Sequence, residues 1–235
     1  MGVIEATPLT ARCGRIFERR EHALLGVSAL NGFFSVPVLA ELLRWAGAEF
    51  DRVDVLVPGA ELAGTLVARG YPPQRARKKA REEINNTRNR VMRALGGLGL
   101  RGVGVFSWTD LMGQPAYSRL RCEVERLFAA DSAFREHCAT AVAPIVDAAS
   151  PSGEQIASAV PFLLAELPLV LDSPSILGTR TSLFCYPRLM PMANWLFAGM
   201  LPVFPVAGQG ILTIRLTGIG AREHHDAGVF QRGGT

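Results

Sequence analysis

Residues 23–35 read "ALLGVSALNGFFS", and this stretch decides the fold. Together with His22, its first half gives an apolar run over residues 22–28 that predicts a buried β-strand. A core strand would favour another aliphatic residue at its end, but this one ends on Ser28, with Asn31 shortly after it. We expect a helix to follow. A hydroxyl between a strand and a helix is a common place for a reactive oxygen, so Ser28 is a candidate functional residue.

The rest of the chain alternates expected strands and helices. Further strands are predicted at 51–58, 102–108, 181–186 and 210–216, and helices at 36–50, 59–69, 72–95, 114–131, 133–149 and 153–167. Residues 1–19 look like an irregular arm and residues 218–235 like a loose tail. Strands separated by helices favour a mostly parallel sheet flanked by helices. We therefore expect one α/β domain over residues 1–235.

In parallel sheets the ligand usually lies beyond the carboxyl ends of the strands. Ser28 and Tyr186 both fall at the carboxyl ends of predicted strands. We expect both side chains at the functional site.

Composition indicates an ordinary globular protein, with 49% hydrophobic and 20% charged residues. No apolar run is long enough to cross a bilayer, and the polar N-terminal segment does not resemble a secretory signal. The scattered cysteines predict a cytoplasmic protein with buried thiols, and they form no metal-ligand set with the histidines (Cys13, Cys122, Cys138, Cys185; His22, His137, His224, His225). We expect no metal, no cofactor, no membrane and a monomer.

Residues 75–93 form a strongly basic segment. It carries eight cations against two glutamates, a net charge of +6, whereas the whole chain carries +4; the cations are Arg75, Arg77, Lys78, Lys79, Arg81, Arg88, Arg90 and Arg93. An apolar stripe can dock this helix on the protein body (Ala76, Ala80, Ile84, Val91, Leu95). A solvated helix face is the plain interpretation. The charge favours binding to the phosphates of a nucleic acid. No motif indicates sequence-specific reading of bases, and we do not expect DNA as the partner.

Ser28 does not fit an ordinary hydrolase. Gly26-Val27-Ser28-Ala29-Leu30 fails the G-x-S-x-G pattern at its last position. His22 precedes Ser28 on the same strand, about 20 Å away at the usual rise per residue, and cannot take its proton. A helix cap remains an alternative use of Ser28. A serine that acts on an already activated ester remains the other.

Several segments together resemble the cyclodipeptide synthases. These are "HALLGVSALNGFFS", "LLRWAGAEFDRVDVLV", "ARGYPPQRARKKA", "FLLAELPLVLDSPSIL" and "SLFCYPRLMPM", which occur in the family's order over residues 20–216. The resemblance implies an enzyme that joins two aminoacyl-tRNAs into a 2,5-diketopiperazine. It implies a Rossmann-like domain similar to the catalytic domain of tyrosyl- and tryptophanyl-tRNA synthetases, and it gives the basic helix a tRNA partner.

The resemblance also implies roles for single residues. Ser28 matches the nucleophile that accepts the first aminoacyl group, and Glu166 matches the glutamate that binds the substrate ammonium and assists proton transfer. Tyr186 matches the family's tyrosine, Asn31 steadies the acyl carbonyl, and Gly26 keeps the pocket floor open. An ester that arrives activated can react with a serine that has no histidine partner.

Two positions depart from the family pattern. Phe162 stands where the family has tyrosine, four residues before Glu166, so one hydroxyl contact to the amine is missing. Pro187 after Tyr186 is typical of one branch, whereas Asn31 is typical of the other, which has histidine after the tyrosine. The proton-shuttling role of that histidine cannot be assigned in this sequence.

The resemblance further predicts two side-chain pockets. The first should be lined by Leu24, Leu56, Trp108, Leu169 and Phe184, and the second by Ala141, Ile145, Arg188 and Met190. Trp108 is bulkier than the expected leucine-like residue, which favours a small first amino acid. Arg188 suits an acidic second one, unless it faces solvent or tRNA phosphate. Cyclo(Ala-Glu) or a relative is the hypothesis.

Two other functions are weighed against this one. A non-catalytic RNA-binding domain explains the basic helix but not Ser28, Glu166 and Tyr186 in register. A nucleotide-binding Rossmann enzyme is disfavoured because "GGLGLRGVG" precedes its strand and lacks the G-x-G-x-x-G pattern. The chain also lacks the HIGH and KMSKS signatures of aminoacyl-tRNA synthetases.

Overall fold

The computed structural model describes residues 2–146 and 148–217. Its strands form one six-stranded sheet in the order β1-β6-β5-β2-β3-β4. The strands are β1 (Val3–Pro8), β2 (His22–Gly26), β3 (Arg52–Val57), β4 (Gly104–Ser107), β5 (Ser182–Tyr186) and β6 (Gln209–Thr217). All neighbours pair in parallel except β1 with β6. The predicted mostly parallel α/β sheet is confirmed.

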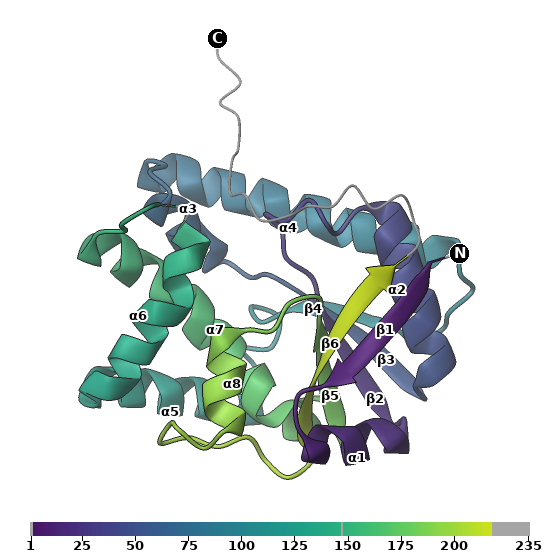
Figure 1. Cartoon of the computed structure of the whole chain (residues 1–235). Coiled ribbons are helices and arrows are strands. Elements are labelled where there is room, and N and C mark those ends of the chain that lie inside the picture. Colours follow the sequence, from purple (N-terminus) through teal and green to yellow (C-terminus); the bar gives the residue numbers. More distant parts are fainter. Residues whose placement is uncertain (1, 147, 218–235) are drawn as a thin grey trace.

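Helices cover both faces of this sheet. They are α1 (Ala11–Arg19), α2 (Val36–Glu49), α3 (Leu62–Ala68), α4 (Pro73–Gly96), α5 (Pro115–Ala130), α6 (Ser132–Val146), α7 (Gly153–Leu177) and α8 (Pro191–Phe197). Leu24 of β2 belongs to the core formed with α5 to α8, and Leu25 to the core formed with α1 and α2. Figure 1 shows these two helical groups on opposite sides of the strands.

The predicted irregular arm over residues 1–19 is wrong. Residues Val3–Pro8 form β1, with side chains alternating between solvent and the sheet's core, and Ala11–Arg19 form α1. The Thr10 side chain caps α1 by accepting a hydrogen bond from the backbone N–H of Cys13 at 3.2 Å. The alternation over six residues and the threonine cap were both readable in the sequence.

Other elements differ in their ends. Strand β2 ends at Gly26 rather than at residue 28. Helix α7 continues to Leu177, ten residues past its predicted end, although Pro168 and Pro174 lie inside it and Asp172 has a non-helical backbone. Burial of its apolar side chains outweighs the cost of the prolines. Helix α8 was not predicted.

Helix α7 is also the one helix, among the described residues, that is long and apolar enough to cross a membrane. In the most apolar 18 residues of this helix, 67% of the segment is buried within the protein. It packs against α3, α5 and α6. Its hydropathy is accounted for by its place in the core.

Three of the four cysteines are buried as predicted, namely Cys13, Cys138 and Cys185. Cys122 is exposed on α5, so the prediction of burial is wrong for this residue. All four are free thiols. The predicted loose tail, with His224 and His225, lies outside the described residues.

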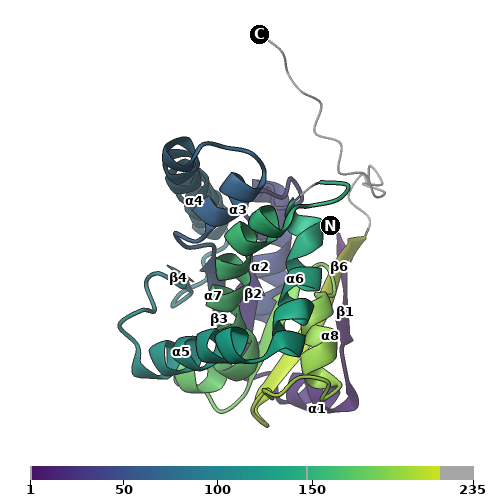
Figure 2. The ribbon, with the colours of Figure 1, turned by 90° about the vertical axis from the view of Figure 1, so that its left-hand side faces the viewer.

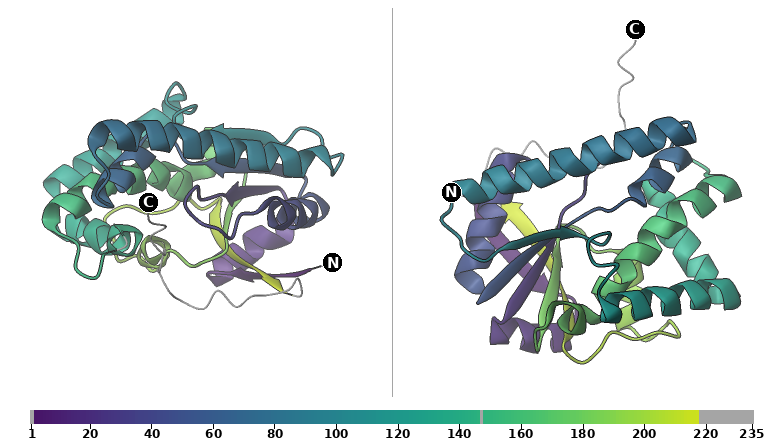
Figure 3. Two further views of the ribbon diagram at one scale, coloured as in Figure 1. Left: turned by 90° about the horizontal axis from the view of Figure 1, so that it is seen from above. Right: turned by 180° about the vertical axis from the view of Figure 1, so that it is seen from behind.

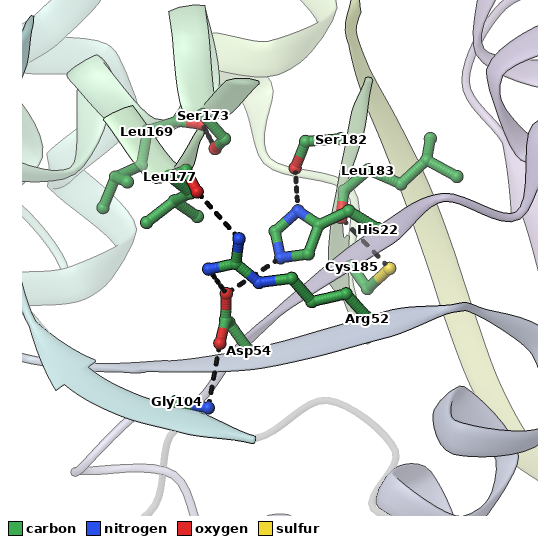
Figure 4. A network of polar contacts seen from close by, with 10 residues as sticks. All are labelled: His22, Arg52, Asp54, Gly104, Leu169, Ser173, Leu177, Ser182, Leu183 and Cys185. Atoms are coloured by element: carbon green, nitrogen blue, oxygen red, sulfur yellow. Dashed lines mark hydrogen bonds and ion pairs between the residues drawn. The ribbon is translucent and has the colours of Figure 1, made fainter. Parts of the chain in front are cut away.

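A buried polar network joins the amino-terminal halves of the strands. His22 Nδ1 lies 2.8 Å from Ser182 Oγ on β5, and His22 Nε2 lies 3.2 Å from Asp54 Oδ2 on β3. Asp54 also accepts from the Gly104 N–H and pairs with Arg52. Figure 4 shows the imidazole between its two partners. Since Ser182 is fully buried, this Ser–His–Asp set holds strands together rather than meeting a substrate.

Candidate active site

A cavity of about 420 Å³ lies beyond the carboxyl ends of the parallel strands. Its lining includes Ser28 after β2, Pro58 after β3, Trp108 after β4 and Tyr186 at the end of β5. Glu166 reaches the same cavity from α7. The structure thus brings together side chains from opposite ends of the chain, at the edge of the sheet that the sequence predicted.

Ser28 lies in the loop between β2 and α2, two residues beyond the end of the strand. Helix α2 begins only at Val36, and its N-cap is Ser35. The alternative that Ser28 caps this helix is therefore wrong. Ser28 is partly exposed and lines the cavity, where the described lining residues include no histidine.

Tyr186 is the partner of Ser28 in the cavity. Burial raises the pKa of Tyr186 to about 12, and the nearby Glu166 raises it too, although hydrogen bonds with the side chains of Ser28 and Asn31 act in the opposite direction. The phenol is therefore neutral at physiological pH. It is a fixed hydrogen-bonding group beside the serine hydroxyl rather than a base.

Glu166 is the acidic group of the cavity. Burial among apolar side chains of α7 raises its pKa to about 7. A carboxyl with such a pKa exchanges its proton easily near neutral pH and gains a charge most readily when a cation is close. The site is suited to hold an ammonium group and then to transfer its proton.

Gly26 and Asn31 shape the surroundings of Ser28. A Cβ on residue 26 would lie 3.0 Å from Phe184 Cζ and 3.1 Å from Tyr186 Cδ2, so glycine allows both rings to pack against the strand. The Asn31 side-chain oxygen accepts a hydrogen bond from the Phe33 N–H at 2.9 Å, which fixes the loop. Its side chain also lines the cavity.

Most residues predicted for the two side-chain pockets line this single cavity. They are Leu56, Trp108, Ala141, Ile145, Arg188 and Met190; Phe162, which stands where the family has tyrosine, lines the cavity as well. Leu24, Leu169 and Phe184 are fully buried and belong to the core behind it, so their predicted place in the lining is wrong. Leu24 and Phe184 are partners on neighbouring strands, further from the strand ends than Gly26 and Tyr186.

Sequence reasoning missed two groups of lining residues. Leu62 and Thr65 of α3 form one group with Arg69, the C-cap residue of that helix, and Pro191, Met192 and Ala193 of α8 form the other. Helix α8 was not predicted at all, although Pro191 at its first turn is a typical start signal. The i, i+3 and i+7 spacing of Leu62, Thr65 and Arg69 could have indicated one shared helix face.

The eight predicted phosphate-binding cations all lie on α4, but they are not equivalent. Lys79 pairs with Glu83 at 2.8 Å and Arg88 with Asp110 at 2.6 Å, while Arg90 donates to Thr87 at 3.0 Å. The exposed cations are Arg75, Arg77, Lys78, Arg81 and Arg93. Four of these five lie in the first half of the helix.

This first half of α4 packs against the loop between β2 and α2 that carries Ser28, here called the serine loop. Ala76 and Ala80 share one apolar cluster with Leu62 and Leu66 of α3 and with Ala29, the neighbour of Ser28. Figure 2 shows α3 and α4 side by side, and Figure 3 shows α4 lying lengthwise across one end of the molecule. The buried stripe differs from the predicted one, since Ile84 and Leu95 are only partly buried and Thr87 and Ala94 are buried.

The fold and cavity define an α/β enzyme with a serine, a carboxyl and a phenol at the sheet's carboxyl edge. The sequence pattern of the family described as "Cyclodipeptide synthase" matches residues 4–216. The chain is 34% identical to the cyclo(L-leucyl-L-leucyl) synthase of Bacillus subtilis (strain 168), over 78% of this chain and 77% of that one. It is 30% identical to the cyclo(L-leucyl-L-phenylalanyl) synthase of Streptomyces noursei, over 85% and 87%.

Solved structures agree. A cyclodipeptide synthase from Bacillus thermoamylovorans matches with a TM-score of 0.85 at 27% identity, covering 90% of this chain and 96% of that one. A Mycobacterium tuberculosis protein, described as demonstrating that cyclodipeptide synthetases are related to type I tRNA synthetases, matches with a TM-score of 0.83 at 28% identity, covering 90% and 92%.

This chain belongs to the cyclodipeptide synthase family. It is therefore an enzyme, and the reading as a non-catalytic RNA-binding domain is set aside. Members of the family form cyclic dipeptides from aminoacyl-tRNAs. Among residues 2–146 and 148–217, no three His, Cys, Asp or Glu side chains gather as a metal site.

Proposed function

We propose that this enzyme makes its cyclic dipeptide through an aminoacyl ester on Ser28. The observation that supports this most is the shared cavity of Ser28, Glu166 and Tyr186, with Tyr186 hydrogen-bonded to the serine. Ser28 Oγ attacks the carbonyl carbon of the first aminoacyl-tRNA, and the bond to the ribose oxygen breaks. The ribose hydroxyl leaves with the serine's proton, and the acyl group stays on the enzyme.

Two amide bonds then complete the ring. The amine of the Ser28-bound residue attacks the ester of a second aminoacyl-tRNA, which releases the second tRNA and leaves a dipeptidyl ester. The terminal amine of this dipeptide attacks the Ser28 ester carbonyl and expels the serine oxygen. The serine recovers its proton and the diketopiperazine leaves, so the cycle is of the ping-pong type.

Glu166 and Tyr186 assist these steps in different ways. An amine must lose its proton before it can attack, and a carboxyl with a pKa of about 7 can hold the ammonium and accept that proton. Tyr186 remains a neutral phenol that orients the serine oxygen. The Asn31 side chain hydrogen-bonds with the same phenol and, in this mechanism, stabilises the acyl carbonyl. Phe162 offers no hydroxyl, so Glu166 and Tyr186 carry amine recognition.

The acyl-enzyme is tested by intact-protein mass spectrometry after mixing with charged tRNA. Wild type is expected to gain the mass of one aminoacyl group, and Ser28→Ala is expected to gain none. Ser35→Ala is the matched control, because Ser35 lies in the same loop and its side chain makes no helix-cap hydrogen bond. An unmodified wild type, together with cyclic product from Ser28→Ala, would refute the proposal.

For the product, we propose cyclo(Ala-Glu) or a close relative. Trp108 occupies part of the cavity wall, which favours a small first residue. Arg188 lines the same cavity, and none of the ion pairs found among the described residues includes it. A guanidinium with this environment can receive the carboxylate of an acidic second residue.

The product proposal is tested with Arg188→Leu. When all charged tRNAs are offered together, this variant should lose the acidic residue from its cyclic product. Arg180→Leu is the control, since its side chain is 88% exposed and lies before β5 rather than at the cavity. An unchanged product spectrum in Arg188→Leu would remove this arginine from substrate selection.

We also propose that the exposed cations of α4 bind the phosphates of the tRNA acceptor stem. They lie on the helix whose apolar side packs with the serine loop, so a stem bound there brings its aminoacyl end toward the cavity. The free thiols suit a reducing compartment, which supports a cytoplasmic location.

A further inference from the structure

Trp108 is held in the cavity wall by a carboxylate from another loop. Its indole Nε1–H donates a hydrogen bond to Glu61 Oε2 at 2.6 Å. Its ring packs edge-to-face on Phe162 of α7, with ring centroids 4.9 Å apart. Trp108 is only 2% exposed although it lines the cavity. The ring therefore fills space that a shorter side chain would leave to the substrate.

Glu61 bonds through its side chain to Trp108 rather than to the backbone of its own helix. It precedes α3 at the N-cap position, yet its side chain makes no hydrogen bond to its own helix. Its second oxygen lies 3.3 Å from Arg121 of α5, and Arg121 also pairs with Glu125. The carboxylate is thus fixed between a cation and the indole.

The backbone around Glu61 is built for the same contact. A Cβ on residue 59 would lie 2.4 Å from Trp108 Nε1, so glycine is required for the indole to approach this loop. The Ala60 N–H donates to Thr109 Oγ1 at 3.1 Å, which joins the loop after β3 to the loop after β4. The Trp108–Glu61 and Ala60–Thr109 hydrogen bonds, together with Gly59, fix the distance between the loop after β3 and the loop after β4.

We propose that Glu61 is a positioning residue: by fixing the Trp108 indole, it sets the size of the part of the cavity that receives the first aminoacyl side chain. The inference rests on the proposed function, because it concerns which aminoacyl group Ser28 accepts. With Glu61 in place the indole closes the end of the cavity against Phe162, and small aminoacyl groups are selected. Without the acceptor the buried N–H has no partner, and the ring turns away to regain one.

The test compares Glu61→Ala with Glu61→Gln while all charged tRNAs compete. Glu61→Ala should raise the ratio of cyclic dipeptides with a larger first residue to those with a small one by about tenfold. Glu61→Gln should keep the wild-type ratio, because the amide oxygen can still accept from the indole. Glu125→Ala is the control, since it removes an outer carboxylate of the same network without touching Trp108.

A double variant separates positioning from a general structural effect. Trp108→Leu should show the enlarged pocket by itself, and adding Glu61→Ala should change its product ratio no further. If Glu61→Ala keeps the wild-type ratio, or if it shifts the ratio equally in the Trp108→Leu background, the inference is overturned.

Near-ultraviolet circular dichroism gives a readout that does not need product. The Trp108 signal, obtained by difference from Trp108→Leu, should change in Glu61→Ala and not in Glu61→Gln. An unchanged signal in Glu61→Ala overturns the inference. If this signal responds as expected but wild type forms no acyl-enzyme, the proposed function fails and the indole contact stands.

Discussion

His22 and Asp54 face one another across β2 and β3, with His22 Nε2 lying 3.2 Å from Asp54 Oδ2 in the sheet's core. Both side chains are almost completely buried. Burial raises the pKa of Asp54, but the bonds from His22, Arg52 and the Gly104 N–H outweigh this and hold it below its ordinary value. The native sheet therefore favours the ionised carboxylate.

Asp54→Asn should lower the free energy of unfolding by about 2 to 4 kcal/mol, because a partner of a buried network is lost. The contribution of Asp54 is present above its ordinary pKa of 3.8 and is lost as pH falls below that value. The variant's deficit, measured by urea unfolding, should therefore shrink in acid. Glu41→Gln, which breaks a surface pair on α2, is the control and should cost under about 1 kcal/mol.

Gly26→Ala should slow formation of the proposed acyl-enzyme more than it affects folding. The added methyl group meets Phe184 and Tyr186 at about 3 Å, so the phenol must move away from Ser28. Overpacking of this kind costs about 1 to 3 kcal/mol in stability. Gly32→Ala lies in the same loop with nothing within 4 Å of its Cβ and should acylate at the wild-type rate. Equal rates in both variants would contradict the tight packing described for residue 26.

Glu166 should make the protein less stable as pH rises. Its pKa is about 7 in the folded protein and 4.5 ordinarily, so the folded state binds the proton more tightly. Stability is then highest below pH 4.5 and falls until about pH 7. Relative to wild type, Glu166→Gln should gain about 1 to 3 kcal/mol between these limits. Urea unfolding across this pH range, with the exposed Glu154→Gln on the same helix as control, measures the gain; parallel curves would contradict the raised pKa.

The exposed cations of α4 should dominate tRNA binding. The double variant Arg77→Gln, Lys78→Gln should weaken binding of uncharged tRNA and reduce the slope of log affinity against log salt by about 1.5. Arg15→Gln, Arg19→Gln removes the same charge from α1, at the opposite end of the molecule (Figure 1), and should change little. Filter binding over a salt series measures both. Equal losses in the two variants would mean that overall charge, rather than α4, attracts the tRNA.

Much of the fold could be predicted because its strands are short apolar runs and its helices are amphipathic. The parallel sheet, the basic helix and the place of Ser28 and Tyr186 at one sheet edge all follow from such local patterns. Strand β1 was missed because it lies at the sheet's edge, where its residues alternate between exposed and partly buried and none is fully buried. The extension of α7 was missed because local rules stop a helix at proline, while its burial comes from contacts distant in sequence.

The resemblance to a family supplied the site residues, and the structure shows what resemblance alone could not. It separates Tyr186 and Gly26, which reach the cavity, from Leu24 and Phe184, which lie one layer deeper. The partner of Trp108 was also beyond prediction. Glu61 is an unremarkable glutamate before a short helix, and only the packing of two loops gives it a role.

Strand β5 lies between β2 and β6, beside a strand made far earlier in synthesis. During synthesis, Ser28 is therefore present long before the ribosome has added Glu166 and Tyr186, the other two residues of the proposed mechanism. Only when α7 has packed and β5 has paired with β2 do Glu166 and Tyr186 share a cavity with Ser28. Under the proposed mechanism, a nascent chain that ends before Tyr186 therefore has an incomplete active site and should not react with the aminoacyl-tRNAs around the ribosome.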